Sequence, residues 1–223
     1  PWMSQKGQSI GQHYGLVALG LFKSQEEIDS APKHIGTVQI GDIRYKDMNE
    51  DGVIDEYDEC PIGYSNIPRI QFGLTAGFSY KGFDFSMLWQ GAAQFSVYFS
   101  NGAVWEFRDG GNAFEHHLGR FNPEDPSTWD KATYPRLHDG NFPNNHRKST
   151  YWLKKGDYLR LKNVEIGYSL PKHLFSKIGV SKLRFFVSGT NLLTFDHQNT
   201  FDPETENERA YNYPQMSQYT FGV

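Results

Sequence analysis

The stretch that decides the fold class reads Ile70-Gln-Phe-Gly-Leu-Thr-Ala-Gly-Phe-Ser-Tyr80, followed by Lys81-Gly82 and Phe83-Asp-Phe-Ser-Met-Leu-Trp-Gln90. Apolar residues alternate with polar or small ones along both runs, and successive side chains of a β-strand point to opposite faces. Each run therefore predicts a strand with one apolar and one mostly polar face. The Lys-Gly pair between them predicts a tight turn, so the two strands form a hairpin.

This alternation is typical both of a transmembrane β-barrel and of a soluble β-sandwich, because a strand of either kind has one apolar face. Three features favour the barrel. The polar face carries small or amide-bearing residues, Tyr80, Phe83 and Trp89 lie near strand ends as in membrane aromatic girdles, and short connections alternate with long ones. We therefore expect an all-β fold, a transmembrane antiparallel β-barrel, with lipid contact at Phe72, Leu74, Phe78, Phe85 and Met87.

Three more strands are predicted downstream of the hairpin. The run from Asp157 to Leu170 changes phase near Asn163, where one extra residue, a β-bulge, restores a single apolar face. Leu183 begins the next strand, and the alternation of Tyr219, Phe221 and Val223 marks the last. Between them, residues 171–181 predict a short turn with one helical turn at 172–178.

The connections predict an orientation. The turns at 81–82 and 171–181 are short and should share the periplasmic rim, whereas residues 100–150 and 195–212 and the acidic loop at 47–58 should share the extracellular rim. Upstream, residues 11–22 and 37–45 predict strands. Residues 24–29 predict a short helix with Ser24 as its N-cap and Glu27 as its partner.

The acidic loop at residues 47–58 is the sharpest local motif. Its oxygen-bearing side chains, a glycine and a free carbonyl follow the spacing of calcium-binding loops, although that pattern ends on Glu where this chain has Asp. We expect a structural Ca²⁺ site; the alternative is a solvated acidic turn around Gly52. The expected ligands are Asp47, Asn49, Asp51, the Val53 carbonyl, Asp55 and Asp58.

Aromatic and histidine side chains of the long connection are the other candidates for binding. Trp105, Trp129, Tyr134 and Trp152 are suited to stack on sugar rings or contact a partner; alternatively, they pack the loop on itself or join the outer girdle. The spacing of His116, His117, His138 and His146 does not suit zinc, and we expect them to be solvated.

Composition excludes several classes of function. A net charge of −4 leaves no basic footprint for nucleic acid, and the single Cys60 excludes an internal disulfide. No stretch approaches the length of a membrane helix, which does not argue against a barrel, because barrel strands are short and alternate. A nucleophile elbow and a phosphate-binding glycine loop are both lacking, so we expect no enzyme and no catalytic residues.

Several segments together resemble one family of transporters. They are residues 10–15, 41–47 running into the acidic loop, 73–82, 158–164, 189–192 and 213–222. From about residue 10 to the end, the chain resembles the C-terminal barrel strands of SusC/RagA-type TonB-dependent outer-membrane transporters of Bacteroidetes.

The resemblance implies a 22-stranded barrel closed by an N-terminal plug. It also implies import of glycans or peptides driven by TonB–ExbB–ExbD beneath a SusD-like lipoprotein. Residues 1–223 would then be the C-terminal part of the barrel, without the plug and the earlier strands. The chief alternative is a secreted calcium-binding β-sandwich that binds carbohydrate or acts as an adhesin, and a glycoside hydrolase is a more distant one.

Overall fold

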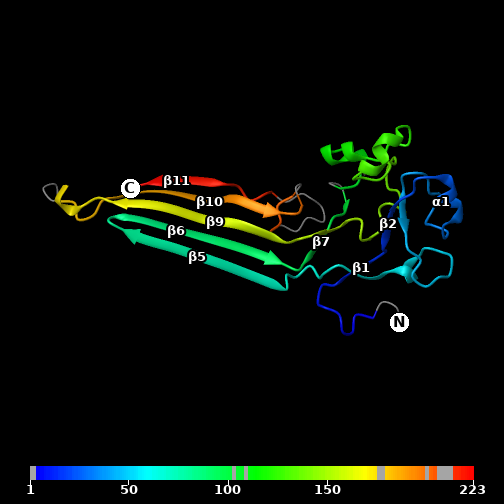
Figure 1. Cartoon of the computed structure of the whole chain (residues 1–223), viewed down its shortest axis with the longest axis horizontal. Coiled ribbons are helices and arrows are strands. Elements are labelled where there is room, and N and C mark those ends of the chain that lie inside the picture. Colours follow the sequence, from blue (N-terminus) through cyan, green and yellow to red (C-terminus); the bar gives the residue numbers. More distant parts are fainter. Residues whose placement is uncertain (1–3, 102–103, 108–109, 175–178, 199–200, 205–212) are drawn as a thin grey trace. The chain divides into compact units, whose positions relative to one another are not determined.

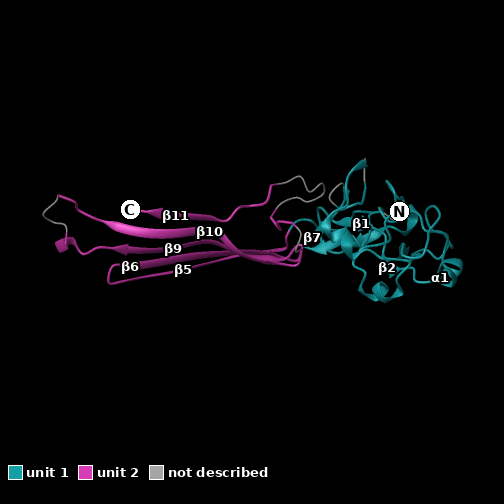
Figure 2. Cartoon of the chain, turned by 90° about the horizontal axis from the view of Figure 1, so that it is seen from above, with its two compact units in different colours: residues 1–67, 96–155, 206–212 teal, residues 68–95, 156–205, 213–223 magenta. Residues whose placement is uncertain are grey.

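The computed structural model describes residues 4–101, 104–107, 110–174, 179–198, 201–204 and 213–223. The chain divides into two compact units, coloured separately in Figure 2. Unit 1 comprises residues 1–67, 96–155 and 206–212, and unit 2 comprises residues 68–95, 156–205 and 213–223. The sequence did not lead us to expect this division, because its alternation identifies strands but not the packing of the long connections.

Unit 2 contains a five-stranded antiparallel sheet, and Figure 1 shows its strands side by side. Its order is β11-β10-β9-β6-β5, and all neighbouring strands are antiparallel. The strands are β5 (Ile70–Tyr80), β6 (Phe83–Ala93), β9 (Tyr158–Ser169), β10 (Arg184–Asp196) and β11 (Gln218–Gly222). These are the five strands that the alternation predicts, with boundaries shifted by no more than a few residues.

The β5–β6 connection is a two-residue hairpin loop. Tyr80 pairs with Phe83, and the loop residues Lys81 and Gly82 both have positive φ, at 47° and 86°. Two positive φ angles in succession give a turn whose twist matches that of the flanking strands. A side chain at Gly82 would also meet the Ser169 carbonyl oxygen at 2.7 Å, so the turn needs glycine for space as well as for backbone conformation.

Both short connections of unit 2 lie at one end of the sheet. Phe83 at the start of β6 pairs with Tyr168 near the end of β9, and Arg184 at the start of β10 pairs with Ser169. The turn at 81–82 and the connection 170–183 therefore share an end, as predicted. Only a 3-10 helix, η6 (Lys172–Leu174), represents the expected helical turn at 172–178; residues 175–178 lie outside the described part.

Unit 1 is built from short elements around its own core. Three two-stranded sheets pair β1 (His13–Gly15) with β4 (Cys60–Ile62), β2 (Ala18–Leu21) with β3 (Ile43–Tyr45), and β7 (Ser96–Tyr98) with β8 (Leu153–Lys155). The 3-10 helices in the described part of unit 1 are η1 (Glu56–Asp58), η4 (Glu115–Gly119) and η5 (Pro126–Lys131). Its fully buried large side chains include Leu16, Phe22, Ile43, Tyr45, Ile54 and Phe121.

One α-helix, α1 (Gln25–Ser30), lies among the described residues of unit 1. As predicted, the Ser24 hydroxyl accepts a hydrogen bond from the Glu27 N–H at 3.3 Å and caps the first turn. Within the described part of the chain, no helix has the length and apolar character needed to cross a membrane.

Candidate functional site

The five-stranded sheet of unit 2 has one continuous apolar face. Cross-strand pairs such as Phe78–Phe85, Phe85–Ile166 and Ile166–Val187 carry the apolar positions of one strand onto the next. We call this surface the apolar face. Its residues are Phe72, Leu74, Ala76, Phe78, Tyr80, Phe83, Phe85, Met87, Trp89, Leu159, Leu161, Val164, Ile166, Tyr168, Phe185, Val187, Leu193, Phe195, Tyr219 and Phe221.

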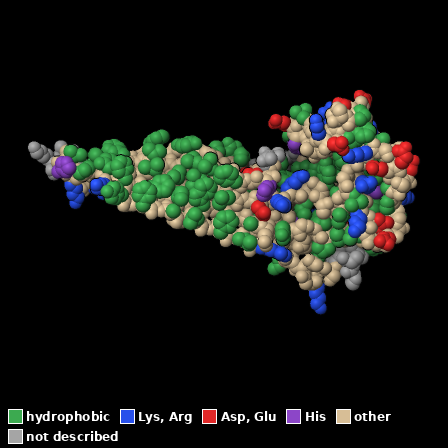
Figure 3. Space-filling view, viewed as in Figure 1, with side chains coloured by type: hydrophobic (Ala, Val, Ile, Leu, Met, Phe, Trp, Pro, Cys, Tyr) green, Lys and Arg blue, Asp and Glu red, His purple; other side chains and the backbone are tan. Residues whose placement is uncertain are grey.

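Much of the apolar face is open to the surroundings. Leu74 is 57% exposed and Phe78 is 63% exposed, and Figure 3 shows hydrophobic side chains spread along the sheet. A contiguous exposed apolar surface of this kind marks contact with a membrane or a partner. The register confirms that the five side chains expected to contact lipid share this face.

A β-bulge in β9 keeps the apolar face continuous. Leu88 of β6 pairs with Asn163, but the next residue, Trp89, pairs with Leu161, so Lys162 is the extra residue. The predicted bulge near Asn163 is therefore confirmed. Because the bulge shifts the alternation by one residue, it leaves Arg160 and Lys162 together opposite the apolar face.

The two basic residues at the bulge form ion pairs with the connection that follows β10. The Arg160 guanidinium is 2.9 Å from an Asp202 carboxylate oxygen and 3.3 Å from one of Glu204, and the Lys162 ammonium is 2.6 Å from the same Glu204 oxygen. Arg160 also donates to the Thr194 hydroxyl at 2.9 Å. No local pattern in the sequence predicts this cluster, because 42 positions separate Arg160 from Asp202.

The environment of Asp202 favours its ionised form. Burial raises the pKa of Asp202, but hydrogen bonds from the Glu204 N–H, the Arg160 guanidinium and the Gln215 N–H outweigh it and leave the pKa below its ordinary value. We call Arg160, Lys162, Asp202 and Glu204 the bulge cluster. It joins a strand of the sheet to the last long connection.

Unit 1 contains a buried polar network around Glu106. Its carboxylate accepts hydrogen bonds from the Tyr134 hydroxyl at 2.6 Å, from His146 Nε2 at 3.1 Å and from the His138 N–H at 3.0 Å. Burial raises the pKa of Glu106, yet these donors outweigh burial and hold the pKa below its ordinary value. Burial, together with the same carboxylate, raises the pKa of Tyr134.

The network continues through Asp42. This fully buried carboxylate is 2.5 Å from His138 Nε2 and accepts a hydrogen bond from the Asn145 amide at 2.9 Å. The Asn145 side-chain oxygen accepts from the Ile43 N–H at 3.0 Å, and its carbonyl accepts from the Trp152 indole at 2.6 Å. Residues 134–152 are thereby tied to β3, which makes the network a scaffold for the long connection.

The expectation that the four histidines are solvated is wrong for three of them. His117 and His146 are buried, and the His138 side chain is only 14% exposed. In His146, Nε2 lies 3.1 Å from a Glu106 carboxylate oxygen, and Nδ1 lies 3.1 Å from the Phe142 N–H nitrogen and 3.0 Å from the Asn141 side-chain oxygen. Burial lowers the pKa of His117, although its bond to the Val104 carbonyl acts in the opposite direction. Each of the three rings also has a partner farther away in sequence, which no local pattern predicts: Val104 for His117, Asp42 for His138 and Glu106 for His146.

The four aromatic candidates mostly pack inside unit 1. Tyr134 and Trp152 are buried, with ring centroids 5.4 Å apart. Trp105 stacks on His146 at 4.6 Å, and Trp129 stacks on Phe121 at 5.1 Å and donates to the Asn122 carbonyl. The structure thus gives Tyr134 and Trp152 internal roles, whereas ligand contact by the half-buried Trp105 and Trp129 stays a prediction.

The acidic loop forms a compact turn in which backbone N–H groups of the loop donate hydrogen bonds to its own carboxylates. Asp47 accepts from the Glu50 and Gly52 N–H groups at 2.7 and 2.8 Å, and buried Asp58 accepts from the Met48 and Asp55 N–H groups. Gly52 has a φ of 85°, as the motif requires. Among the described residues, no three His, Cys, Asp or Glu side chains converge closely enough to hold a metal ion. Calcium binding therefore stays a prediction.

Comparison with known proteins places the chain among bacterial receptors. It is 32% identical over 230 residues to TonB-dependent receptor P26 of Formosa agariphila and 25% identical over 233 residues to TonB-dependent receptor P3 of the same organism. These matches cover 97% and 98% of the chain but 22% of each relative, so the chain spans about a fifth of their length. No family model matches the chain.

Solved structures with a similar fold come from a peptide importer. The RagAB peptide transporter superposes with a TM-score of 0.69 at 22% identity, and the RagAB peptide importer in its open-open state with 0.66 at 22% identity. Each match covers 94% of the chain and 22% of the solved chain. The relatives are receptors rather than enzymes, which confirms the prediction that the chain is not an enzyme.

Proposed function

The chain belongs to the TonB-dependent receptors of the SusC/RagA type, and from this premise we propose that it serves nutrient uptake across the outer membrane of a Gram-negative bacterium. The sheet of unit 2 supplies C-terminal strands of a closed 22-stranded barrel. TonB–ExbB–ExbD supplies energy through the N-terminal part of the receptor.

The apolar face is the observation that carries this proposal. Five antiparallel strands present apolar side chains on one surface and mostly polar ones on the other, as a barrel wall between lipid and an aqueous lumen does. The backbone groups between neighbouring strands are paired within the sheet, which a segment in lipid requires. Tyr80, Phe83, Tyr168 and Tyr219 add the aromatic rings that barrel surfaces carry.

The secreted β-sandwich remains the alternative, and the same face argues against it. A sandwich buries its apolar face under a second sheet about 10 Å away, whereas Leu74 and Phe78 of the edge strand β5 and Ile166 of the central strand β9 are all more than half exposed here. Fractionation of cells that express the full-length protein tests the choice. A barrel stays in the outer membrane until detergent is added, whereas recovery in the soluble fraction without detergent would contradict the proposal.

The substrate and the partner form the finer part of the proposal. We assign import of oligosaccharides or peptides together with a SusD-like surface lipoprotein. The sequence relatives support the receptor class, and the fold likeness to a solved peptide importer supports a substrate of oligomer size. A strain lacking the receptor should lose growth on defined oligosaccharides or on peptides as sole carbon source. Unchanged growth on both would contradict the assignment.

A structural calcium ion at residues 47–58 completes the proposal. The ligand spacing and the positive φ of Gly52 support it, because such loops wrap oxygen ligands around a hard cation. The ion would screen the mutual repulsion of the four Asp side chains. Its role is structural, since the protein fills nearly every position of the motif.

A further inference from the structure

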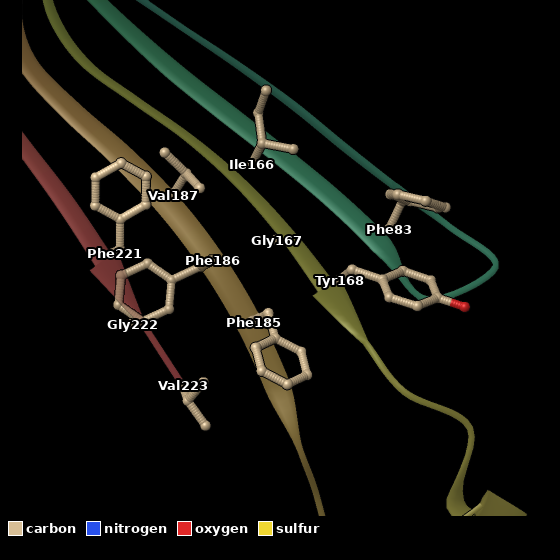
Figure 4. Close-up of a pocket in the computed structure, with 10 residues that line it drawn as sticks. All are labelled: Phe83, Ile166, Gly167, Tyr168, Phe185, Phe186, Val187, Phe221, Gly222 and Val223. Carbon is tan, nitrogen blue, oxygen red and sulfur yellow. The ribbon is translucent and has the colours of Figure 1, made fainter.

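An apolar groove crosses β6, β9, β10 and β11 near the short-turn end of the sheet (Figure 4). Its volume is about 630 Å³, within the range of small-ligand sites. Because side chains alternate between faces, the paired row Gly167–Phe186–Gly222 leaves bare backbone on the apolar face as the floor. Side chains of the rows before and after it form the walls, among them Phe83, Tyr168, Phe185, Ile166, Val187 and Phe221.

A basic rim adjoins one end of this groove. We use the term basic rim for Lys81, Lys172 and Lys182, which are all exposed and lie in the two short connections. Lys81 leads through Gly82 into Phe83 of the groove wall, and Lys182 precedes Phe185 by three residues. Figure 3 shows basic side chains gathered beside the hydrophobic surface at this end.

The charge of the rim is offset in part at Lys182, which lies close enough to Asp84 for the two charges to interact. The connection 170–183 contains no Asp or Glu in its sequence. The nearby carboxylates Asp84 and Glu165 both bind Arg184 on the opposite face of the sheet. The Lys81 ammonium lies 5.2 Å from the centre of the Tyr80 ring, a cation–π contact that holds it beside the apolar face.

We propose that the groove and the basic rim together form a binding site for one anionic phospholipid, with an acyl chain in the groove and the phosphate on the rim. The site rests on the proposed function, because it requires the apolar face to lie in a bilayer. Lysines at the edge of a membrane attract anionic headgroups, and apolar grooves between aromatic side chains accommodate acyl chains. Charge and shape thus select the same occupant.

Native mass spectrometry of the full-length receptor in detergent tests the site, with phosphatidylglycerol and phosphatidylcholine as the probes. The wild type should retain phosphatidylglycerol at lower concentrations than phosphatidylcholine. The rim variant Lys81→Gln/Lys172→Gln/Lys182→Gln should lose this preference, by about fivefold in affinity for each lysine. Val187→Trp fills the groove with an apolar side chain and should weaken binding of both lipids.

The matched control is Lys6→Gln/Lys33→Gln/Lys131→Gln, which removes three exposed lysines of unit 1 and should leave the preference unchanged. Equal retention of the two lipids by the wild type, or equal losses in the rim and control variants, would overturn the site. Insertion of the receptor into bilayers of either lipid is measured as well, because it distinguishes failure of the lipid site from failure of the proposed function. A receptor that inserts but shows no preference contradicts the site alone, whereas one that inserts into neither contradicts both.

Discussion

At the scale of single residues, neighbours along a strand meet different surroundings. Leu74 and Thr75 are adjacent in β5, yet Leu74 pairs with Trp89 on the apolar face and Thr75 points to the opposite face. We expect Leu74→Arg to destabilise the inserted barrel by roughly 2–4 kcal/mol, because it places a charge in lipid. The measurement is the amount of heat-modifiable, folded receptor in the outer membrane.

The neighbouring variant Thr75→Arg is the control for this prediction. Its side chain would enter a wide aqueous lumen, so the amount of folded receptor should stay close to that of the wild type. Similar losses for both variants would show that the two faces are assigned wrongly.

Glu106 makes unit 1 sensitive to acid. Hydrogen bonds lower the pKa of Glu106 in the folded chain below its ordinary value of 4.5, so the ionised carboxylate stabilises the fold above that pH. This stability should be lost as the pH falls from 4.5 through the lower folded pKa. In the full-length receptor, hydrogen exchange at residues 134–146 should therefore accelerate over that interval.

The variant Glu106→Gln distinguishes the contribution of this carboxylate from other effects of acid on the receptor. Glu106→Gln should cost about 1–3 kcal/mol of local stability at neutral pH, because its hydrogen-bond donors stay buried. It should also flatten the dependence of exchange on pH. The exposed Glu124→Gln is the matched control, and an acid response that persists in full in Glu106→Gln would refute the assignment.

The acidic loop offers a direct test for calcium. Asp51→Ala should abolish calcium-dependent protection of residues 47–58 from protease while leaving the barrel folded, because the loop loses one ligand of the motif. Glu56→Ala, outside the ligand set, should keep the protection. If calcium protects neither the wild type nor Glu56→Ala, the loop is a solvated turn.

At the scale of elements, the bulge in β9 links the wall of the sheet to a connection. Arg160 is 3% exposed and its partner Asp202 has a side chain 6% exposed, so each ion depends on the other. Removing one member of such a buried pair costs about 3–5 kcal/mol. Arg160→Gln should therefore speed hydrogen exchange at residues 201–204 strongly, whereas Lys162→Gln, at a more exposed site, should act weakly.

A double-mutant cycle isolates the pair itself. Arg160→Gln/Asp202→Asn should be less destabilising than the sum of the two single changes, because each single change leaves one buried charge unpaired and the double change leaves none. Strict additivity would mean that the contact between them contributes little.

At the scale of the whole molecule, the main question is which side of the membrane each connection faces. Epitope tags inserted after Gly140 and after Gly179 form a matched pair, because both glycines have positive φ and open space around them. Antibodies should label intact cells that carry the tag at 140 but not at 179, since long loops face outward and short turns face the periplasm. The reverse pattern would invert the proposed topology.

The sequence by itself determined the strands, their two faces, the bulge and the capped helix. All of these depend on local rules: side chains alternate with a period of two, one extra residue changes the phase, and a serine three residues before a glutamate caps a turn. Such features do not depend on which distant residues a segment contacts. A single segment such as 70–90 is therefore enough to predict them.

Only the tertiary structure decided what the long connections do. The sequence alone suggests solvated loop positions for His138, His146 and Glu106. The fold buries these side chains by bringing Asp42, Glu106 and residues 134–152 together. The pairing of Arg160 with Asp202 likewise follows from how a connection returns to the bulge. Burial and ion pairing between distant residues depend on the whole chain's packing free energy, which no local pattern contains.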